Sequence, residues 1–201
     1  MPRIEPPKHP GPITRLALRV AKRKSGGTLP EPFAVQAHHP TLMNGYGAFE
    51  WAFMRSHRAP KKLKLLAELK SAALCGCEWC MDYGSWLSRH GAGITDEQLR
   101  ELPRFRESAA FSDEEKLVLE YAECISRTPV SVPDELFARL KERFDEAQLI
   151  ELTYAAAIEN MRARFNWALG IESQDYSDGA VCVRPETLPD AQTPEVSLRS
   201  P

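Results

Sequence analysis

Apolar positions recur every three to four residues along most of this chain, which is the period of an amphipathic α-helix. The segments with this pattern are bounded by residues that start and stop helices. They are expected over residues 10–24, 41–55, 60–76, 77–90, 95–102, 112–127, 133–144 and 145–169. No segment alternates apolar and polar residues as a half-buried strand does. The pattern therefore predicts an all-α fold of about eight helices in one domain.

Polar residues mark several of the expected helix starts. Thr95, Ser112 and Asp145 are each followed three residues later by Gln or Glu, and this spacing predicts a capping box at each position. Thr41, after His39-Pro40, is the expected N-cap of the helix that runs to about residue 55.

The two ends of the chain differ in composition from its middle. Residues 1–29 are basic and contain one amphipathic segment, so they are expected to form an N-terminal helical arm. Residues 30–171 hold the remaining helical patterns and form the expected helical domain. Residues 172–201 are rich in Pro, Ser, Asp and Thr, which predicts an irregular C-terminal tail.

Composition limits the classes of partner. The net charge of −2 gives no reason to expect nucleic acid binding. The sequence has no run of 18 apolar residues, and its first residues lack the apolar core of a signal peptide, so we expect no membrane partner. These features predict a cytoplasmic protein, in a compartment where thiols are kept reduced.

The strongest chemical signal is Cys77-Glu78-Trp79-Cys80 at the start of an expected helix. Two cysteines at this spacing can cycle between dithiol and disulfide, and a helix N-terminus after a lysine-rich helix favours the reactive thiolate. The alternative is that both are small apolar residues buried at a helix junction. No metal site is expected. A zinc site needs four ligands, and Cys75, Cys77, Cys80 and His90 cannot share one ion, because His90 lies on the order of 15 Å along the same helix.

Three further residues near this pair are candidates for the site. Glu68 is expected to act as a general base held near the cysteines, or else to form a surface ion pair with Lys64 or Lys61. Trp79 and Tyr83 are candidates for the wall of an apolar substrate pocket, although aromatic residues on helices usually pack in the core, and core packing is the favoured interpretation.

Polar residues interrupt the last, otherwise apolar helix. Buried polar groups need partners, so we expect a network such as Glu159 with Arg162 or Arg164 that fixes helix packing or a subunit contact. The alternative is that Glu159 or Arg164 reaches the thiol pocket and orders a substrate. His39 is expected to cap a helix rather than to relay protons.

Six stretches, in this order along the chain, carry a family resemblance: LAELK (66–70), CEWC (77–80), GITDEQL (93–99), FSDEE (111–115), LIEL (149–152) and NMRARFN (160–166). On these stretches the chain resembles the carboxymuconolactone decarboxylase superfamily, on its alkylhydroperoxidase D-like branch. The resemblance covers about residues 30–179. It implies an alkylhydroperoxidase D-like helical bundle and, as a rule in the family, a homo-oligomer such as a dimer, trimer or hexamer.

The resemblance also implies roles for residues. In the peroxidase branch the second cysteine attacks the peroxide and the first resolves, which assigns attack to Cys80 and resolution to Cys77. A glutamate and a histidine form the family's proton relay, and their positions here are Leu65 and Gly84. Glu68 lies one helical turn after Leu65, so we expect it to accept the proton instead.

The leading hypothesis is a thiol-dependent oxidoreductase that reduces a hydroperoxide or a disulfide without a bound cofactor, and that an external thiol restores. One alternative is a cofactor-free decarboxylase or lactone-type enzyme that does not use the thiols and acts on a small organic substrate through Glu159, Arg164 and His39. Another alternative is a non-catalytic ligand-binding oligomer.

Overall fold

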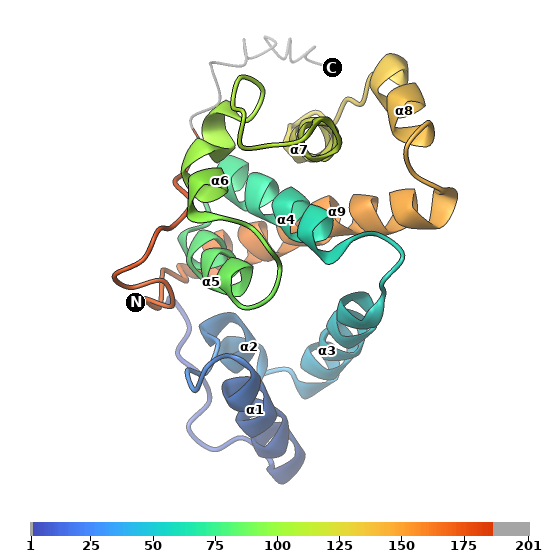
Figure 1. Cartoon of the computed structure of the whole chain (residues 1–201). Coiled ribbons are helices and arrows are strands. Elements are labelled where there is room, and N and C mark those ends of the chain that lie inside the picture. The colour runs from blue at the N-terminus through green and yellow to red at the C-terminus, as the bar shows by residue number, and fades with distance from the viewer. Residues whose placement is uncertain (1, 187–201) are drawn as a thin grey trace, which may run out of the picture.

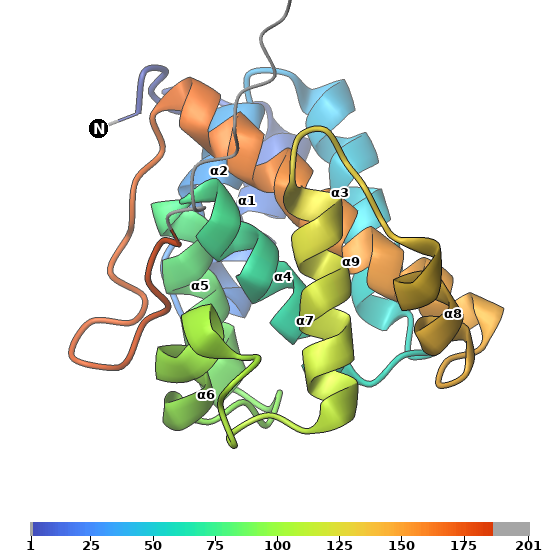
Figure 2. The same cartoon turned by 90° about the horizontal axis from the view of Figure 1, so that it is seen from above.

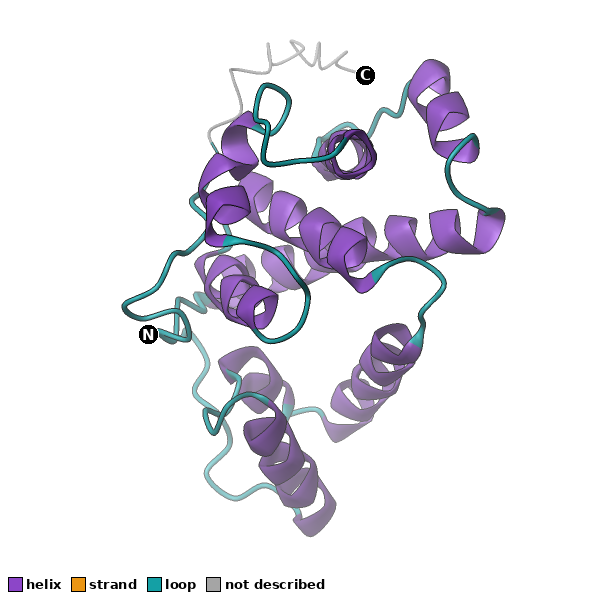
Figure 3. Cartoon of the chain, in the orientation of Figure 1, coloured by secondary structure: helices purple, strands orange, loops and turns teal. Residues whose placement is uncertain are grey.

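A computed structural model describes residues 2–186, and these form helices joined by loops, with no strand among them (Figure 3). The chain order is α1 Pro12–Lys24, α2 Glu31–Gln36, α3 Pro40–Arg55, α4 Lys61–Cys75, α5 Glu78–Arg89, α6 Asp96–Glu101, the short 3₁₀ helix η1 Leu102–Arg104, α7 Asp113–Ser126, α8 Asp134–Lys141 and α9 Glu146–Leu169. The all-α prediction is therefore confirmed, and most expected helices lie within a few residues of their predicted bounds.

The predicted capping boxes are confirmed. Thr95, Ser112 and Asp145 each accept a hydrogen bond from the backbone N–H three residues on, and the Gln or Glu at that position bonds back to the cap residue. These caps satisfy N–H groups that the first helical turn leaves without intrahelical partners.

Two local predictions need correction. The N-cap of α3 is His39 rather than Thr41, because Pro40 occupies the first helical position, where its fixed φ and missing N–H suit the helix start. The His39 ring accepts from the backbone of Leu42 at 3.3 Å, as the capping interpretation expected. The short helix α2 was not predicted, because its six residues are too few for a periodic pattern to stand out.

Helix α4 is the centre of the fold. It packs against α9, α7 and α5, and most of its side chains are buried, so that it has no solvent-facing stripe over most of its length. Seen from above, α5, α7 and α9 lie around it, while α1, α2 and α3 lie to one side of this body (Figures 1 and 2). The main core is centred on apolar residues from α4, α5, α7 and α9, and the other helices except α1 also contribute to it.

The junction between α4 and α5 places the cysteine pair at a helix start. Gly76 ends α4 in the left-handed conformation, with φ of 65°, which a residue with a side chain adopts only at a cost. Cys77 follows as the N-cap of α5, and its sulfur accepts from the Cys80 N–H at 3.3 Å. The turn therefore holds the cysteine pair at the N-terminal end of α5.

Residues 172–186 have no regular secondary structure and are held against α5. The carboxylate of Asp82, buried on α5, accepts hydrogen bonds from the backbone N–H groups of Gln174, Tyr176 and Ser177 and from the hydroxyl of Ser173. The remainder of the predicted tail, residues 187–201, lies outside the described residues. The described helices include none with the length and apolar composition that a membrane-spanning segment requires.

Candidate active site

Cys77 and Cys80 are joined in a disulfide, and both side chains are buried. Cys80 lines a cavity of about 1010 Å³, whereas Cys77 is not among its lining residues. The difference follows from their positions: Cys77 caps the helix and turns its sulfur toward the backbone N–H of Cys80. A molecule in the cavity can therefore meet Cys80 first.

The cavity lies between the helical body and the N-terminal helices. Its wall includes residues from α2 and α3 on one side and from α4, α5 and α9 on the other. Most of the wall is apolar, and aromatic side chains contribute much of it. Among these, Trp79 and Tyr83 stack with ring centroids 4.8 Å apart. Both residues thus lie where the pocket interpretation expected them, and both also pack against the core.

The polar part of the wall is one cluster of charged residues around Arg162. Its guanidinium donates to Glu50 at 2.5 Å, to Glu159 at 2.9 Å and to Glu68 at 3.2 Å. It also contacts the hydroxyl of Tyr46 at 3.1 Å. These residues come from α3, α4 and α9, and all of them line the cavity. The expected pairing of Glu159 with Arg162 is confirmed, and it extends to two further carboxylates.

One guanidinium faces three carboxylates in this cluster, which leaves negative charge in excess when all are ionised. Burial raises the pKa of Glu68 to about 7, although Arg162 opposes the shift, while Glu159 and Glu50 add to it. Burial likewise raises the pKa of Glu159. A carboxyl group that titrates near neutral pH can both accept and release a proton under ordinary conditions.

The alternative of a surface ion pair for Glu68 is wrong. Lys64 is buried and pairs with Glu151 at 2.5 Å, and Lys61 donates to the carbonyl of Gly91. Lys70 is also engaged elsewhere, with Glu186 at 2.5 Å. The described lysines on α4 thus serve other contacts, and the expectation that they would activate the thiols is not supported by their positions.

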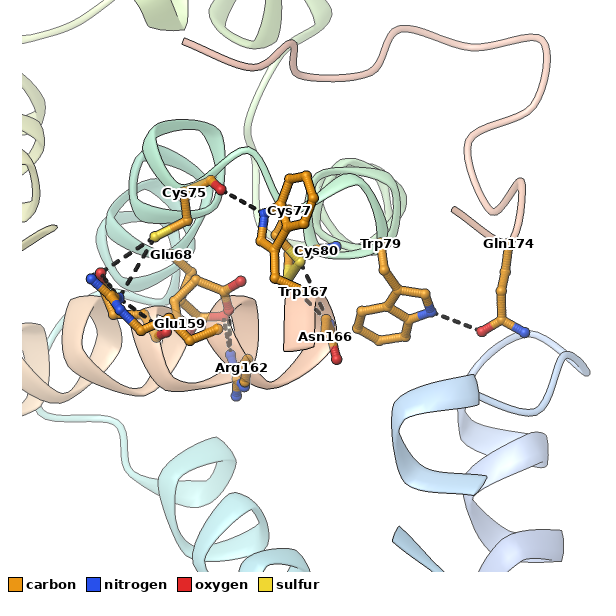
Figure 4. The surroundings of a disulfide bond; sticks show 12 residues. Glu68, Cys75, Cys77, Trp79, Cys80, Glu159, Arg162, Asn166, Trp167 and Gln174 are labelled. Atoms are coloured by element: carbon orange, nitrogen blue, oxygen red, sulfur yellow. Dashed lines mark hydrogen bonds and ion pairs between the residues drawn. A yellow bond between two sulfur atoms is a disulfide. The ribbon is translucent and has the colours of Figure 1, made fainter. Parts of the chain in front are cut away.

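Asn166 on α9 lies next to both sulfurs. Its side-chain Nδ2 is 3.5 Å from the sulfur of Cys77 and 3.4 Å from that of Cys80, and the side chain is only 1% exposed (Figure 4). An N–H donor in this position stabilises a thiolate when the pair is reduced. Asn166 is one of the polar residues that interrupt the last helix, and its contact with the cysteines was not predicted from the sequence.

Arg164 lies away from the cavity. Its guanidinium donates to Asn160 at 2.6 Å and contacts Cys75 at 3.8 Å, and it is not among the lining residues. The expectation that Arg164 reaches the pocket is therefore wrong. The arginine that lines the cavity is Arg162, two residues earlier on the same helix. His39 does line the cavity, besides capping α3.

The two family relay positions, Leu65 and Gly84, both face the cavity. A Cβ atom built on Gly84 would lie 2.8 Å from Leu69 Cδ2, and Leu69 is 1% exposed. A side chain at this position therefore requires the terminal Cδ2 of Leu69, which also lines the cavity, to shift. Leu65 and Glu68 share one face of α4, so the carboxylate sits one turn along from the family position.

Sequence reasoning missed Glu50 and Tyr46. The signal for Glu50 was available, because it is the only acidic residue of α3. Within residues 2–186, no three His, Cys, Asp or Glu side chains are grouped so that they could hold a metal ion. Burial raises the pKa of each of the three free cysteines, Cys75, Cys124 and Cys182.

A sequence profile of the carboxymuconolactone decarboxylase family matches residues 40–123. The uncharacterized protein YnjA of Escherichia coli strain K12 is 41% identical over 112 residues, which are 56% of this chain and 61% of that protein. The match therefore spans less than two thirds of YnjA. The uncharacterized protein YdfG of Bacillus subtilis strain 168 is 32% identical over 106 residues, 52% of this chain and 71% of YdfG.

Solved structures of similar fold include the debrominase Bmp8, with a TM-score of 0.76 and 20% identity over 86% of this chain and 92% of Bmp8. They also include the alkylhydroperoxidase AhpD core of an uncharacterized peroxidase-related protein from Ralstonia eutropha JMP134. Its TM-score is 0.72, with 16% identity over 87% of this chain and 93% of that chain. At these identities the likeness establishes the shared fold.

Proposed function

The chain belongs to the carboxymuconolactone decarboxylase family, and we propose that it is a thiol-dependent oxidoreductase that reduces an apolar organic hydroperoxide through Cys80 and Cys77. The observation that carries the proposal is that Cys80 shares one apolar cavity with Glu68, a carboxyl group whose pKa is about 7. A nucleophile and a proton acceptor in one largely apolar cavity are the parts that this chemistry needs.

In the proposed reaction, the Cys80 thiol gives its proton to Glu68, and Asn166 stabilises the thiolate through its N–H. The thiolate attacks the outer peroxide oxygen and breaks the O–O bond. The alkoxide takes the proton from Glu68 and leaves as an alcohol, and Cys80 becomes a sulfenic acid. The Cys77 thiol then attacks the Cys80 sulfur, which releases water and forms the disulfide. An external thiol returns two electrons and two protons.

A second candidate is reductive dehalogenation by the same thiols. It is favoured by the aromatic wall that Trp79 and Tyr83 provide and by the similar fold of the debrominase Bmp8, which has also been solved with 2,3,4-tribromopyrrole. The balance requires one carbon–halogen bond to be replaced by carbon–hydrogen while two thiols become a disulfide and hydrogen halide is released. The alternative of a decarboxylase-type enzyme that does not use the thiols stays a hypothesis.

The direct test mixes fully reduced protein with cumene hydroperoxide and, separately, with hydrogen peroxide. We expect rapid loss of two of the five thiols per chain and a Cys77–Cys80 disulfide by mass spectrometry, with cumene hydroperoxide faster because the cavity is apolar. Oxidation no faster than that of free cysteine would contradict the proposal. Catalytic activity that survives in the double variant Cys77→Ser/Cys80→Ser would favour the thiol-free alternative.

We also propose that the protein is a homo-oligomer, as its relationship to the family implies. Several large apolar side chains on α3 and α9 are about half exposed or more, among them Trp51, Met54, Tyr154 and Trp167. Exposed apolar groups of this size are typical of surfaces that pack against another subunit. Light scattering after size exclusion measures the mass, and a monomer at working concentration would contradict this part of the proposal.

A further inference from the structure

Two buried side-chain oxygen atoms on α9 lack a hydrogen-bond donor, and both belong to residues that line the cavity. Across the described part of the chain, nothing donates to Asn166 Oδ1 or to Glu159 Oε1, although the two residues are only 1% and 4% exposed. Both residues line the cavity. Buried acceptors almost always have a donor, so each of these atoms is left for a donor from outside the chain, which is a water molecule or a ligand.

Asn166 is oriented by the cysteine pair. Its amide nitrogen faces both sulfurs, and Figure 4 shows its carbonyl oxygen pointing away from them. The amide group is planar, so a donor that reaches Oδ1 lies one amide group away from the sulfur of Cys80. The side chain therefore offers an acceptor at the place where a reacting molecule has to lie.

Glu159 is a poorer candidate for this role. It lies seven residues before Asn166 on the same helix, on the order of 10 Å away along the axis, so the same donor cannot serve both. Burial also raises its pKa, and a protonated carboxyl group can itself donate. The carbonyl oxygen of Asn166 can only accept.

We propose that the cavity takes an apolar organic substrate that carries one O–H or N–H group, which donates to Asn166 Oδ1 and so sets the substrate beside Cys80. The inference rests on the proposed role of Cys80 as the attacking thiol, and it narrows the substrate to a class. A hydroperoxide of a bulky hydrocarbon, which ends in O–H, belongs to that class, and so does an aromatic phenol or N–H heterocycle. An ether or a dialkyl peroxide of the same size does not.

The test compares two probes that differ only in the donor. Calorimetry on the oxidised protein measures the affinity for 2-naphthol and for its methyl ether, 2-methoxynaphthalene. We expect 2-naphthol to bind about tenfold more tightly, because the ether leaves the acceptor buried and unpaired. Equal affinities, or no binding of either probe, would overturn the inference.

Variants locate the acceptor. In Asn166→Leu, which keeps the side-chain size and removes the acceptor, we expect the two probes to bind within about twofold of each other. Asn166→Ala gives the same comparison where the leucine variant does not fold. In Glu159→Gln the preference for 2-naphthol should persist. A preference that survives Asn166→Leu, or that disappears in Glu159→Gln, would overturn the assignment.

This experiment separates the inference from the proposed function. The oxidised protein has no free thiol at Cys77 or Cys80, so the affinity comparison does not depend on whether Cys80 attacks a peroxide. A clear preference for 2-naphthol without hydroperoxide reduction would support the proposed binding site and refute the proposed reaction. Hydroperoxide reduction without a preference would do the opposite.

Discussion

The guanidinium of Arg162 on α9 donates to the carboxylate of Glu68 on α4 at 3.2 Å. It is the main charge that opposes the rise in the pKa of Glu68 that burial causes. The effect of burial is larger, and Glu159 and Glu50, which share the same guanidinium, raise the pKa of Glu68 further. The result is a carboxyl group with a pKa of about 7, in a cavity that Cys80 lines. The shared cation therefore tunes the proton acceptor rather than simply neutralising it.

Removing this cation should move the pH dependence of thiol oxidation. In Arg162→Met, the pKa of Glu68 loses its lowering contribution and rises further above about 7. The rate of thiol loss with cumene hydroperoxide, which needs ionised Glu68, should then rise at a pH about one unit higher or more. The measurement is the rate as a function of pH from 5 to 9.

Arg139→Met is the matched control, because Arg139 forms an exposed ion pair with Glu120 at 3.2 Å away from the cavity. Its pH profile should equal that of the original protein. An unchanged profile in Arg162→Met would mean that Glu68 does not accept the proton.

The raised pKa of Glu68 should also make stability depend on pH. The folded protein holds this proton up to about pH 7, whereas the unfolded chain releases it near the ordinary value of 4.5. The contribution of Glu68 to stability is therefore fully present below about pH 4.5 and is lost as the pH rises through about 7. Glu68→Gln does not titrate, so it should gain stability relative to the original protein over this range.

At about 1.4 kcal/mol per pKa unit, the gain of Glu68→Gln between pH 5 and pH 8 should be on the order of 2–3 kcal/mol. Urea unfolding at both pH values measures it. Glu107→Gln, at an exposed position, is the control and should show no such trend. A difference between Glu68→Gln and the original protein that stays constant with pH would contradict the raised pKa.

How far the sequence could predict the molecule differs between fold and site. The capping boxes at Thr95, Ser112 and Asp145 depend on neighbours within one turn, and so do the helices that they start. These features could be read directly from local spacing. Helix α2 could not, because its six residues are held by long-range contacts such as that between the Glu31 N–H and Gln174.

The site depends on contacts that spacing does not encode. The sequence indicated that polar residues on the last helix need partners, but Glu50 lies 112 residues from Arg162 along the chain. Which arginine turns toward the cavity is decided by the docking of α3 against α9, so Arg164 was a reasonable but incorrect choice. The hydrogen bond from Asn166 to the cysteines likewise joins residues far apart in sequence.

Replacing Cys80 and replacing Cys77 should have different effects on the reaction with peroxide. Cys80→Ser removes the thiol that faces the cavity and should abolish peroxide-dependent oxidation at this site. Cys77→Ser keeps the attacking thiol and removes the resolving one, so a Cys80 sulfenic acid or mixed disulfide should accumulate. Mass spectrometry after trapping with dimedone distinguishes these outcomes.

Cys124→Ser is the control for this comparison, because Cys124 is a free cysteine outside the cavity. It should oxidise at the original rate and form the same Cys77–Cys80 disulfide. Full turnover in Cys80→Ser, or a trapped sulfenic acid on Cys77, would reverse or refute the assignment of the attacking residue.

Adding even a methyl group at Gly84 should lower the stability of the protein. Gly84→Ala puts a Cβ atom 2.8 Å from the terminal Cδ2 of Leu69. We expect the overpacking, which costs about 1–3 kcal/mol, to exceed the gain of about 0.5–1 kcal/mol from helix propensity, so that the variant is less stable. Gly45 is also inside a helix but has nothing within 4 Å of its built Cβ. Gly45→Ala should therefore gain about 0.5–1 kcal/mol from helix propensity.

The contrast isolates the contact with Leu69, because both substitutions remove the same conformational freedom from the unfolded chain. Urea unfolding measures both variants, and Gly84→Ala combined with Leu69→Ala should be less destabilised than the sum of the two single changes. Additive effects, or a Gly84→Ala protein as stable as the original, would mean that Leu69 moves aside at no cost. The family's histidine would then fit here, and its absence would need another cause than the packing of α4 against α5.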